Sequence, residues 1–460
     1  MNITLLVIVL VAYFVGMLAV GFAGRKYASS FSSLVSAGKN AGVVMIAASC
    51  IGGQIGNGFV IGGAAGAAIS GLSGSWYGIG CGLSWICVAF ILNKTVFAKG
   101  FYSLPDLLEE RYGDKLTSII FSTGTAVSYI GNIAAQIMAG SALFKALGLD
   151  GTLGAVVITV VVLLYSLFAG LWGAYATSVV QTAIIIIGMV IISIIVLVNG
   201  GIDTINGAIA QGQVPSSYWN IGACGLAAIL MTAVPVCTST LCDQQVVQRI
   251  NAAKSERSSF IGHIIAGVVC MAAALMPAVI GMYGAAAYGV SDSSVFFVVA
   301  MNALPDLVCA LAIAAVIAAI MSTISSMLVG FSTIMMKNVY KGLLKPSATD
   351  KELSRGNSVV TVVVSLLSLF VSLQFTSIID ALCNAYLILS ACCMVPFLGA
   401  LFWKKGTAKG AVWSSVVGML VMLFYYTKIF VLPTISLSSI AVTAIVYVAV
   451  SLLDKKVAEE

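Results

Sequence analysis

The stretch of the sequence best suited to binding chemistry is 52–58, which reads Gly-Gly-Gln-Ile-Gly-Asn-Gly within an apolar run from about residue 43 to residue 70. Each glycine weakens a helix by about 1 kcal/mol relative to alanine, and a carbonyl freed in hydrocarbon is costly unless a partner satisfies it. Helix breaks are tolerated in membranes where they line an enclosed cavity, and in transporters they mark the ion and substrate site. Close helix packing through small residues is the alternative, but it does not require Gln54 and Asn57.

A second group of oxygen atoms lies far along the chain, at Ala319, Ser322 and Thr323. Sodium is a hard cation that takes oxygen ligands, as other hard cations do. Carbonyls of 52–57 can supply one kind of ligand and the hydroxyls of Ser322 and Thr323 another. The carbonyl of Ala319 lies one turn before Thr323, on nearly the same helix face. Taken alone, these hydroxyls could equally bond carbonyls of their own helix.

The composition indicates a polytopic membrane protein, since 60% of the 460 residues are hydrophobic and only 8% are charged. The net charge of +6 follows from membrane topology and gives no reason to expect nucleic acid as a partner. The 11 cysteines are scattered through apolar runs, so neither a zinc site nor a disulfide framework is expected. No nucleophile–base set is visible, so we do not expect an enzyme.

Apolar segments of spanning length predict about 13 transmembrane helices. They cover residues 3–23, 43–70, 75–98, 116–147, 152–172, 175–199, 220–245, 258–289, 297–338, 357–375, 377–403, 409–427 and 433–453. The first segment has no basic residue ahead of it, so we interpret it as a retained span and not as a signal peptide. An odd number of spans places the two termini on opposite sides of the membrane.

The basic residues predict which side is cytoplasmic. With these spans, all but two of the 22 lysines and arginines fall on one side, and only Lys145 and Lys428 fall on the other. The positive-inside rule then predicts an outside N-terminus and a cytoplasmic C-terminus in the plasma membrane. Between the third and fourth spans, Ser103–Gly113 carries helix start and stop signals and predicts a short amphipathic helix at the inner face.

A second interruption is expected at Pro235–Asp243, in the seventh span. Proline cannot donate a backbone hydrogen bond, and the hydroxyls of Thr238, Ser239 and Thr240 can satisfy freed backbone or face a cavity. The two interruptions open the second and the seventh spans, five helices apart. Paired interruptions at corresponding places in two halves indicate an inverted-repeat transporter.

Six motifs, in the same order along the chain, resemble the sodium:solute symporter family, which includes sodium/glucose, sodium/proline and high-affinity choline transporters. The motif Asp-Gln-x-x-x-Gln-Arg-x-x-x-Ala-Lys at 243–254 matches closely, and Leu-Pro-Asp-Leu-Leu-Glu-Glu-Arg-Tyr-Gly at 104–113 is similar to a family signature. The other four lie at 52–58, at 169–174 with Gln181, at 319–323 and at 402–405. Together they cover essentially the whole chain.

The resemblance implies an all-α LeuT-type fold with a 5+5 inverted repeat, one extra N-terminal helix and two extra C-terminal helices. A single transmembrane domain, 1–460, would then contain the extra helix 3–23, the first repeat 43–199, the second repeat 220–403 and the C-terminal helices 409–453. The resemblance also implies a sodium site made of the carbonyls of Gly52, Ile55 and Ala319 and the hydroxyls of Ser322 and Thr323. The residue types already indicate the same two segments, 52–57 and 319–323, as sources of oxygen ligands.

The remaining polar and aromatic residues near the breaks are candidates for solute binding and gating. Solute-binding candidates are Gln54, Asn57, Phe59, Trp76, Gln136, Thr240 and Asn384. Helix–helix hydrogen bonding is an equal alternative for Gln136. Intramembrane acids are functional hypotheses by default, so Asp243, Arg249 and Asp380 are gating or structural candidates, with Arg249 able to pair with Asp243. The single histidine, His263, is expected to be a solvated residue near the inner interface.

Departures from the family pattern limit what this chain can bind. Ser178 stands where many members have Asp, which puts a second sodium site in doubt. Ser75-Trp76 stands where sugar transporters have Glu-Trp, and Cys50 and Asp243 stand where choline transporters have Trp. Neither a sugar site nor an aromatic cage for choline is therefore expected, and no Lys or Arg is expected in the cavity.

We therefore expect a sodium-coupled symporter that imports a small organic solute by alternating access, with the lipid bilayer as its surroundings and no obligate protein partner implied. The first alternative is a proton-coupled or uniporting carrier of the same fold, which Ser178 motivates. The second alternative is a sensor or channel-like protein without coupled turnover. The sequence leaves amino acids, monocarboxylates, vitamin-like acids and small amines open as solutes.

Overall fold

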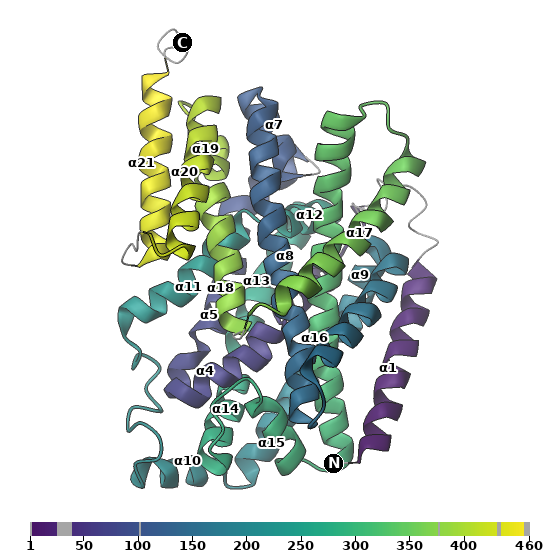
Figure 1. Ribbon diagram of the computed structural model, residues 1–460, viewed down its shortest axis with the longest axis vertical. Helices are drawn as coiled ribbons and strands as arrows, with labels where there is room; N and C mark the ends of the chain where they lie inside the picture. The colour runs from purple at the N-terminus through teal and green to yellow at the C-terminus, as the bar shows by residue number, and fades with distance from the viewer. Residues whose placement is uncertain (1, 25–38, 101–102, 376–377, 430–433, 455–460) are drawn as a thin grey trace.

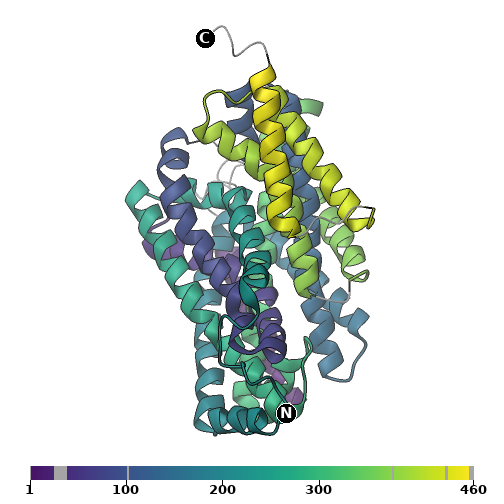
Figure 2. The ribbon, with the colours of Figure 1, turned by 90° about the vertical axis from the view of Figure 1, so that its left-hand side faces the viewer.

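The structure is a computed structural model that describes residues 2–24, 39–100, 103–375, 378–429 and 434–454. Within its helices, the side chains of 3, 18, 20–24, 165, 168–176, 379 and 380 are outside the described part. The helices run mostly along one long axis, with α1 beginning at one end of the molecule and α21 ending at the other (Figure 1). Figure 2 shows α20 and α21 side by side on one flank.

The described chain is helical apart from short connections. Its first half consists of α1 (Ile3–Gly24), α3 (Val43–Gln54), the π-helix η3 (Gly58–Gly62), α4 (Gly63–Ser70), the 3-10 helix η4 (Gly71–Ser75), α5 (Trp76–Cys87), the π-helix η5 (Val88–Leu92), α6 (Asn93–Lys99), α7 (Leu104–Tyr112), α8 (Lys115–Ala146), α9 (Gly151–Val198) and α10 (Gly201–Ala210). Its second half consists of α11 (Gly225–Leu241), α12 (Gln244–Ala252), α13 (Glu256–Ala273), α14 (Leu275–Tyr288), α15 (Val295–Ala303), α16 (Asp306–Thr333), the π-helix η6 (Ile334–Leu344), α17 (Asp350–Ser372), α18 (Ile378–Leu389), the π-helix η7 (Ser390–Met394), α19 (Val395–Phe402), α20 (Ala408–Tyr426) and α21 (Ile435–Leu453).

Among the described residues, nine helices are long and apolar enough to cross a membrane, or ten if the bent pair of α11 and α12 is counted as one span. Shorter apolar helices cover Thr4–Met17, Val43–Gln54 and Gly151–Leu164. The all-α, many-span architecture is as expected, while the number of 13 spans stays a prediction. Two spans were expected at 152–172 and 175–199, but this stretch forms one helical element, α9.

The first expected helix break is present where the glycines cluster. α3 ends at Gln54, Ile55 leaves the helical conformation with φ −79° and ψ 72°, and helical structure resumes at Gly58. At its other end, α3 is joined to the second half of the chain, because the amide of Ala41 donates to the carbonyl of Ala252 (2.9 Å) and the amide of Lys254 donates to that of Ala41 (3.0 Å). Two short backbone bonds thus connect the two broken spans.

The second break lies at the end of the expected range, Pro235–Asp243. Pro235 is inside α11, and the chain bends by 53° between α11 and α12, at Cys242–Asp243. The helix α11 continues past the proline to Leu241, and the hydroxyl of Thr238 donates to the carbonyl of Val234 at 2.8 Å. Asp243 caps α12, since its side chain accepts a hydrogen bond from the amide of Gln245. The expected interruption is therefore present, and the new helix α12 begins at the capping carboxylate of Asp243.

The amphipathic helix expected at 103–113 is confirmed as α7. Ser103 and Asp106 form a reciprocal capping box, a proline stands in the first turn, and Gly113 ends the helix in the left-handed conformation, with φ +63°. Asp106 also bonds the side chains of Lys337 and Asn338 at 334–344. This contact ties the helix to the segment that follows α16.

Candidate functional site

The break after α3 frees the carbonyl oxygen of Gly52. In a continuous helix the amide of Gly56 would donate to Gly52, but here it donates to the carbonyl of Gln54 at 2.9 Å. The carbonyl of Gly52 instead faces α16, where the hydroxyl of Thr323 lies 3.4 Å from it. That hydroxyl is also 3.0 Å from the carbonyl of Ala319, to which it donates. Thr323 therefore stands between two of the three carbonyls that were expected to bind sodium, those of Gly52 and Ala319.

Ser322 completes the contact between the broken span and α16. A Cβ added to Gly52 would lie 2.8 Å from the Ser322 hydroxyl oxygen and 2.7 Å from that of Thr182. Such spacing leaves room for a hydrogen atom and for no larger group. Ile55 is fully buried and contributes the non-helical turn itself. The structure thus brings Gly52, Ala319, Ser322 and Thr323 together, with Ile55 three residues beyond Gly52.

The donors at this contact suit a hard monovalent cation. They are backbone carbonyls and neutral hydroxyls, the oxygen types that hard cations bind. Among the residues that the structure describes, no group of three or more His, Cys, Asp and Glu side chains could hold a metal ion. The residues present therefore fit sodium better than a multivalent transition metal.

Two residues of α9 belong to this site and were not among the expected ligands. The hydroxyl of Ser178 lies 3.2 Å from that of Ser322. The hydroxyl of Thr182 donates to the carbonyl of Ala48 at 2.8 Å. Both side chains are buried, and they stand one helical turn apart. Ser178 was singled out only as a departure from the family, whereas the i, i+4 spacing to Thr182 was a signal that could have identified the pair.

Asn57 and Gln136 hold the break against α8. The amide of Asn57 donates to the side-chain oxygen of Gln136 at 2.9 Å, and the Asn57 side chain donates to the carbonyl of Ala135. Both residues are buried, with exposed fractions of 0% and 3%. Gln136 thus satisfies a backbone amide that the broken helix leaves without its usual partner. This geometry favours helix-to-helix bonding for both carboxamides over direct contact with a solute.

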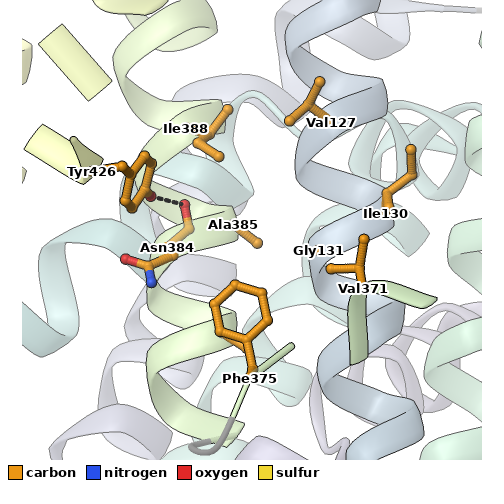
Figure 3. A pocket seen from close by; sticks show the side chains of 10 residues that line it. Val127, Ile130, Gly131, Val371, Phe375, Asn384, Ala385, Ile388 and Tyr426 are labelled. Atoms are coloured by element: carbon orange, nitrogen blue, oxygen red, sulfur yellow. Dashed lines mark hydrogen bonds between the residues drawn. The ribbon is translucent and has the colours of Figure 1, made fainter. Parts of the chain in front are cut away.

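The other solute-binding candidates do not gather at one place. Phe59 is buried, and its ring lies about 3 Å from where a Cβ on Gly78 would stand. The indole of Trp76 donates to the carbonyl of Ile221 at 2.7 Å, and the hydroxyl of Thr240 donates to Val236 of its own helix. Asn384 lines a separate apolar cavity (Figure 3). Of the solute-binding candidates, Gln54 is the one that is half-buried and lies at the break.

Two tyrosines that the sequence did not single out stand beside the break. The hydroxyls of Tyr77, on α5, and Tyr386, on α18, lie 3.3 Å apart. The Tyr77 hydroxyl is also 3.3 Å from where a Cβ on Gly58 would stand, and Leu382 of α18 fills the remaining space there. These neutral groups cover the break on the side where helix η3 begins. The two tyrosines are 309 residues apart, and no motif in the sequence links them, so their contact could not be predicted from the sequence.

Arg249 and Asp243 do not pair directly, contrary to the expectation. The hydroxyl of Tyr129 donates to Asp243, while Arg249 donates to the side chains of Gln245 (3.0 Å) and Ser49 (3.1 Å). Gln245 bridges the two charges, because its side-chain nitrogen also lies 3.5 Å from Asp243. The side chain of Asp380, in α18, is outside the described part of the chain.

The guanidinium of Arg249 is buried against the broken helix, although no arginine was expected in the cavity. Its exposed fraction is 3%, and a Cβ on Gly53 would overlap it. On its other side it packs over the Trp85 ring, 5.4 Å from the centroid. His263 packs on the same indole at 5.4 Å and is fully buried. The expectation of a solvated histidine is therefore wrong, because α13, which carries His263, packs against α3 and α5 and the Trp85 ring lies against the imidazole.

The fold and site together define a membrane transporter: two spans, one in each half of the chain, are broken, and oxygen ligands from both halves meet at the first break. A model of the sodium:solute symporter family matches residues 34–418, and the chain belongs to this family. As expected, the coupling ion is sodium, and the protein is a symporter that spans the membrane many times.

Relatives and solved structures agree with this assignment. The chain is 27% identical to the high-affinity proline transporter PutP of Bacillus subtilis over 435 residues, which cover 87% of this chain and 88% of that one. It is 27% identical to a sodium/proline symporter of Staphylococcus aureus, covering 98% and 93%. A substrate-bound, outward-open structure of a Na+-coupled sialic acid symporter superposes with a TM-score of 0.83 at 19% identity, covering 98% of each chain. Mhp1, a nucleobase-cation-symport-1 transporter, gives 0.62 at 13% identity, covering 92% and 94%. These structures confirm the LeuT-type fold.

Proposed function

We propose that this chain imports a small organic solute together with sodium, and that the ion binds where the broken span meets α16. The proposed ligands are the carbonyls of Gly52, Ile55 and Ala319 and the hydroxyls of Ser322 and Thr323. The observation that carries the proposal is the 3.4 Å approach of the Thr323 hydroxyl to the Gly52 carbonyl, which the break leaves without its helical partner.

Coupling follows from the position of the ligands. Gly52 belongs to the first half of the chain and Thr323 to the second, so the full ligand set exists only while α3 and α16 are close. An ion that binds this arrangement better than a separated one shifts the equilibrium toward it. Separation of the two helices removes ligands and releases the ion. With an outside N-terminus, as the basic residues predict, closure would stabilise the outward-open state and release would occur to the cytoplasm.

The test is the thermal stability of the purified protein against NaCl, with KCl and choline chloride at equal concentration as controls. An ion that binds only the folded protein stabilises it by about 2.7 kcal/mol at 100 times its Kd. We expect a sodium-selective rise in melting temperature that is lost in the double variant Ser322→Ala/Thr323→Ala.

The matched control is Ser332→Ala, a buried serine on the same helix whose hydroxyl donates to the carbonyl of Leu328 at 2.6 Å. This variant should keep the sodium response. An equal response of the unmodified protein to all three salts would contradict the proposed site and favour the proton-coupled or uniporting carrier.

Ser178→Asp should strengthen sodium binding. The Ser178 hydroxyl lies 3.2 Å from that of Ser322, so a carboxylate there would stand next to the ion. Two opposite charges 4 Å apart attract by about 4 kcal/mol at an effective dielectric constant of 20, and desolvation of the carboxylate offsets part of this gain. We expect roughly tenfold tighter sodium binding in the same thermal titration. Ser178→Asn, of the same size without the charge, should show no gain, and a gain in both would refute the electrostatic explanation.

For the solute, we propose a neutral or zwitterionic molecule, with proline tested first. Two observations support this: the sequence relatives named above are proline transporters, and Gln54, Tyr77 and Tyr386 beside the break are uncharged. Arg249, which packs against Gly53 of the broken helix, already donates to Gln245 and Ser49. The experiment is uptake of labelled proline into proteoliposomes under an inward sodium gradient, with a potassium gradient of equal size as the control. Sialic acid is the second solute to test, and uptake driven by a pH gradient alone would favour proton coupling.

A further inference from the structure

An apolar cavity lies against the face of α18 that carries Asn384, Ala385 and Ile388 (Figure 3). It has a volume of about 290 Å³ and lies between α8, α17, α18 and α20, with Val127, Gly131, Val371, Phe375, Ile388 and Tyr426 among its lining residues. A second cavity of about 170 Å³ shares Val127, Ile388 and Tyr426 with it and extends toward Met419. The two together form one groove along α8 and α18, which we call the α8–α18 groove.

The groove opens on the membrane-facing surface. Three of the helices that line it, α8, α17 and α20, are long and apolar enough to span the bilayer, and α18 contributes the first part of a fourth such span, Ala381–Phe402. Val127 and Tyr426, at its edge, have exposed fractions of 48% and 40%. Apart from Asn384 and Tyr426 the lining is apolar, so water there would find few of the two to four hydrogen-bonding partners that a buried water needs. An empty space would forfeit the dispersion contacts of its walls. The surrounding hydrocarbon is the medium that can fill it.

We propose that the α8–α18 groove binds one acyl chain of a bilayer phospholipid. The combined space is of the size of a small-molecule pocket, about 300–1,000 Å³, and it is elongated along the helices. It also has a polar group at one side: the carboxamide of Asn384 makes no hydrogen bond to any residue in the described part of the chain, while its backbone carbonyl accepts one from the Tyr426 hydroxyl at 3.1 Å.

The bound chain would support the position of α18 relative to α8. On the wall between the groove and the break, the hydroxyl of Ser128 donates to the carbonyl of Ala385 at 2.7 Å, and Gly131 packs on the Ala385 side chain. The opposite face of α18 carries Leu382 and Tyr386, which cover the break. An acyl chain behind Ala385 would therefore support the helix whose Leu382 and Tyr386 cover the break, so occupancy of the groove should affect transport without contact with the proposed sodium ligands.

The experiment is photolabelling of the full chain in vesicles with a phospholipid that carries a diazirine on its acyl chain, followed by mass spectrometry of the labelled peptides. We expect label concentrated on 127–131 and 381–388 above the level on 363–370 of α17, where Val363 and Phe370 are 49% and 65% exposed. Val371→Trp fills the groove and should lower the groove label about fivefold or more, because it removes the space for contacts with the chain. Val363→Trp, on an exposed part of the same helix, is the matched control and should not change it.

Several results would overturn the proposal. Label spread in proportion to exposure would show that the groove has no preferred occupant, and unchanged label in Val371→Trp would place the lipid elsewhere. If Val371→Trp does not fold, Val127→Phe fills the groove from the α8 wall and takes its place. Labelling by a diazirine fatty acid but not by the phospholipid would refute the assigned source. None of these outcomes depends on sodium or on solute uptake, so failure of the lipid proposal can be distinguished from failure of the proposed function.

Discussion

Gly52→Ala is expected to abolish the sodium response while leaving the protein folded. The added Cβ would lie 2.7 Å from the Thr182 hydroxyl oxygen and 2.8 Å from that of Ser322, closer than van der Waals contact allows, so the Ser322 hydroxyl must move away from its position as a ligand. Each oxygen contact to a charged group contributes about 1.5–3 kcal/mol. Loss of one or two of them should weaken sodium binding roughly 100-fold or more. The measurement is the sodium dependence of thermal stability and of solute uptake.

Gly63→Ala is the matched control for this substitution. Gly63 begins α4 on the same broken span, and a Cβ there would lie 3.5 Å from Pro277, an ordinary contact. Alanine for glycine within a helix stabilises by about 0.5–1 kcal/mol when there is space. We expect Gly63→Ala to keep the full sodium response with equal or higher stability. If both variants lose the response, the span is sensitive to any substitution and the Gly52 contact is not specific.

Arg249→Ala is expected to open the contact between α3 and α12. Arg249 is buried, bonds Ser49 and Gln245, and fills the space beside Gly53. Each hydrogen bond of a charged group contributes about 1.5–3 kcal/mol, so the loss of both should cost about 3 kcal/mol or more. A loss of about 3 kcal/mol raises the open population roughly 100-fold. The thiol of Cys50, fully buried next to Ser49, reports the opening. Its modification by a membrane-permeant maleimide, followed by mass spectrometry, should accelerate by about that factor.

Arg111→Ala distinguishes a gating contact from a purely structural one. Arg111, on α7, also donates several hydrogen bonds, to the carbonyls of Trp403, Lys404 and Gly406. Its removal should lower stability without exposing Cys50, because these partners lie at the end of α19. If Arg249→Ala destabilises the protein but leaves Cys50 as protected as in Arg111→Ala, Arg249 has a structural role alone.

Local sequence features predicted the elements that depend on local chemistry. The glycines of 52–58 end α3 because they weaken the helix at that point, and Ser103, Pro105 and Gly113 begin and end α7 through capping. The many-span, all-α architecture follows from long apolar segments alone. The second break lies inside the expected range, Pro235–Asp243, but Pro235 does not cause it, because α11 continues past the proline to Leu241 and Asp243 caps α12.

The sequence by itself thus determined the membrane class, the place of the first break and the oxygen-bearing segments that could meet there. Only the tertiary structure decided which of these groups touch. It placed Ser178 and Thr182 at the candidate sodium site, inserted Gln245 between Asp243 and Arg249, and turned Asn384 toward a separate groove. The reason is physical: helix boundaries depend on residues a few positions apart, whereas a binding site depends on how helices distant in the sequence rotate and pack, and side chains on neighbouring faces of one helix then meet different partners.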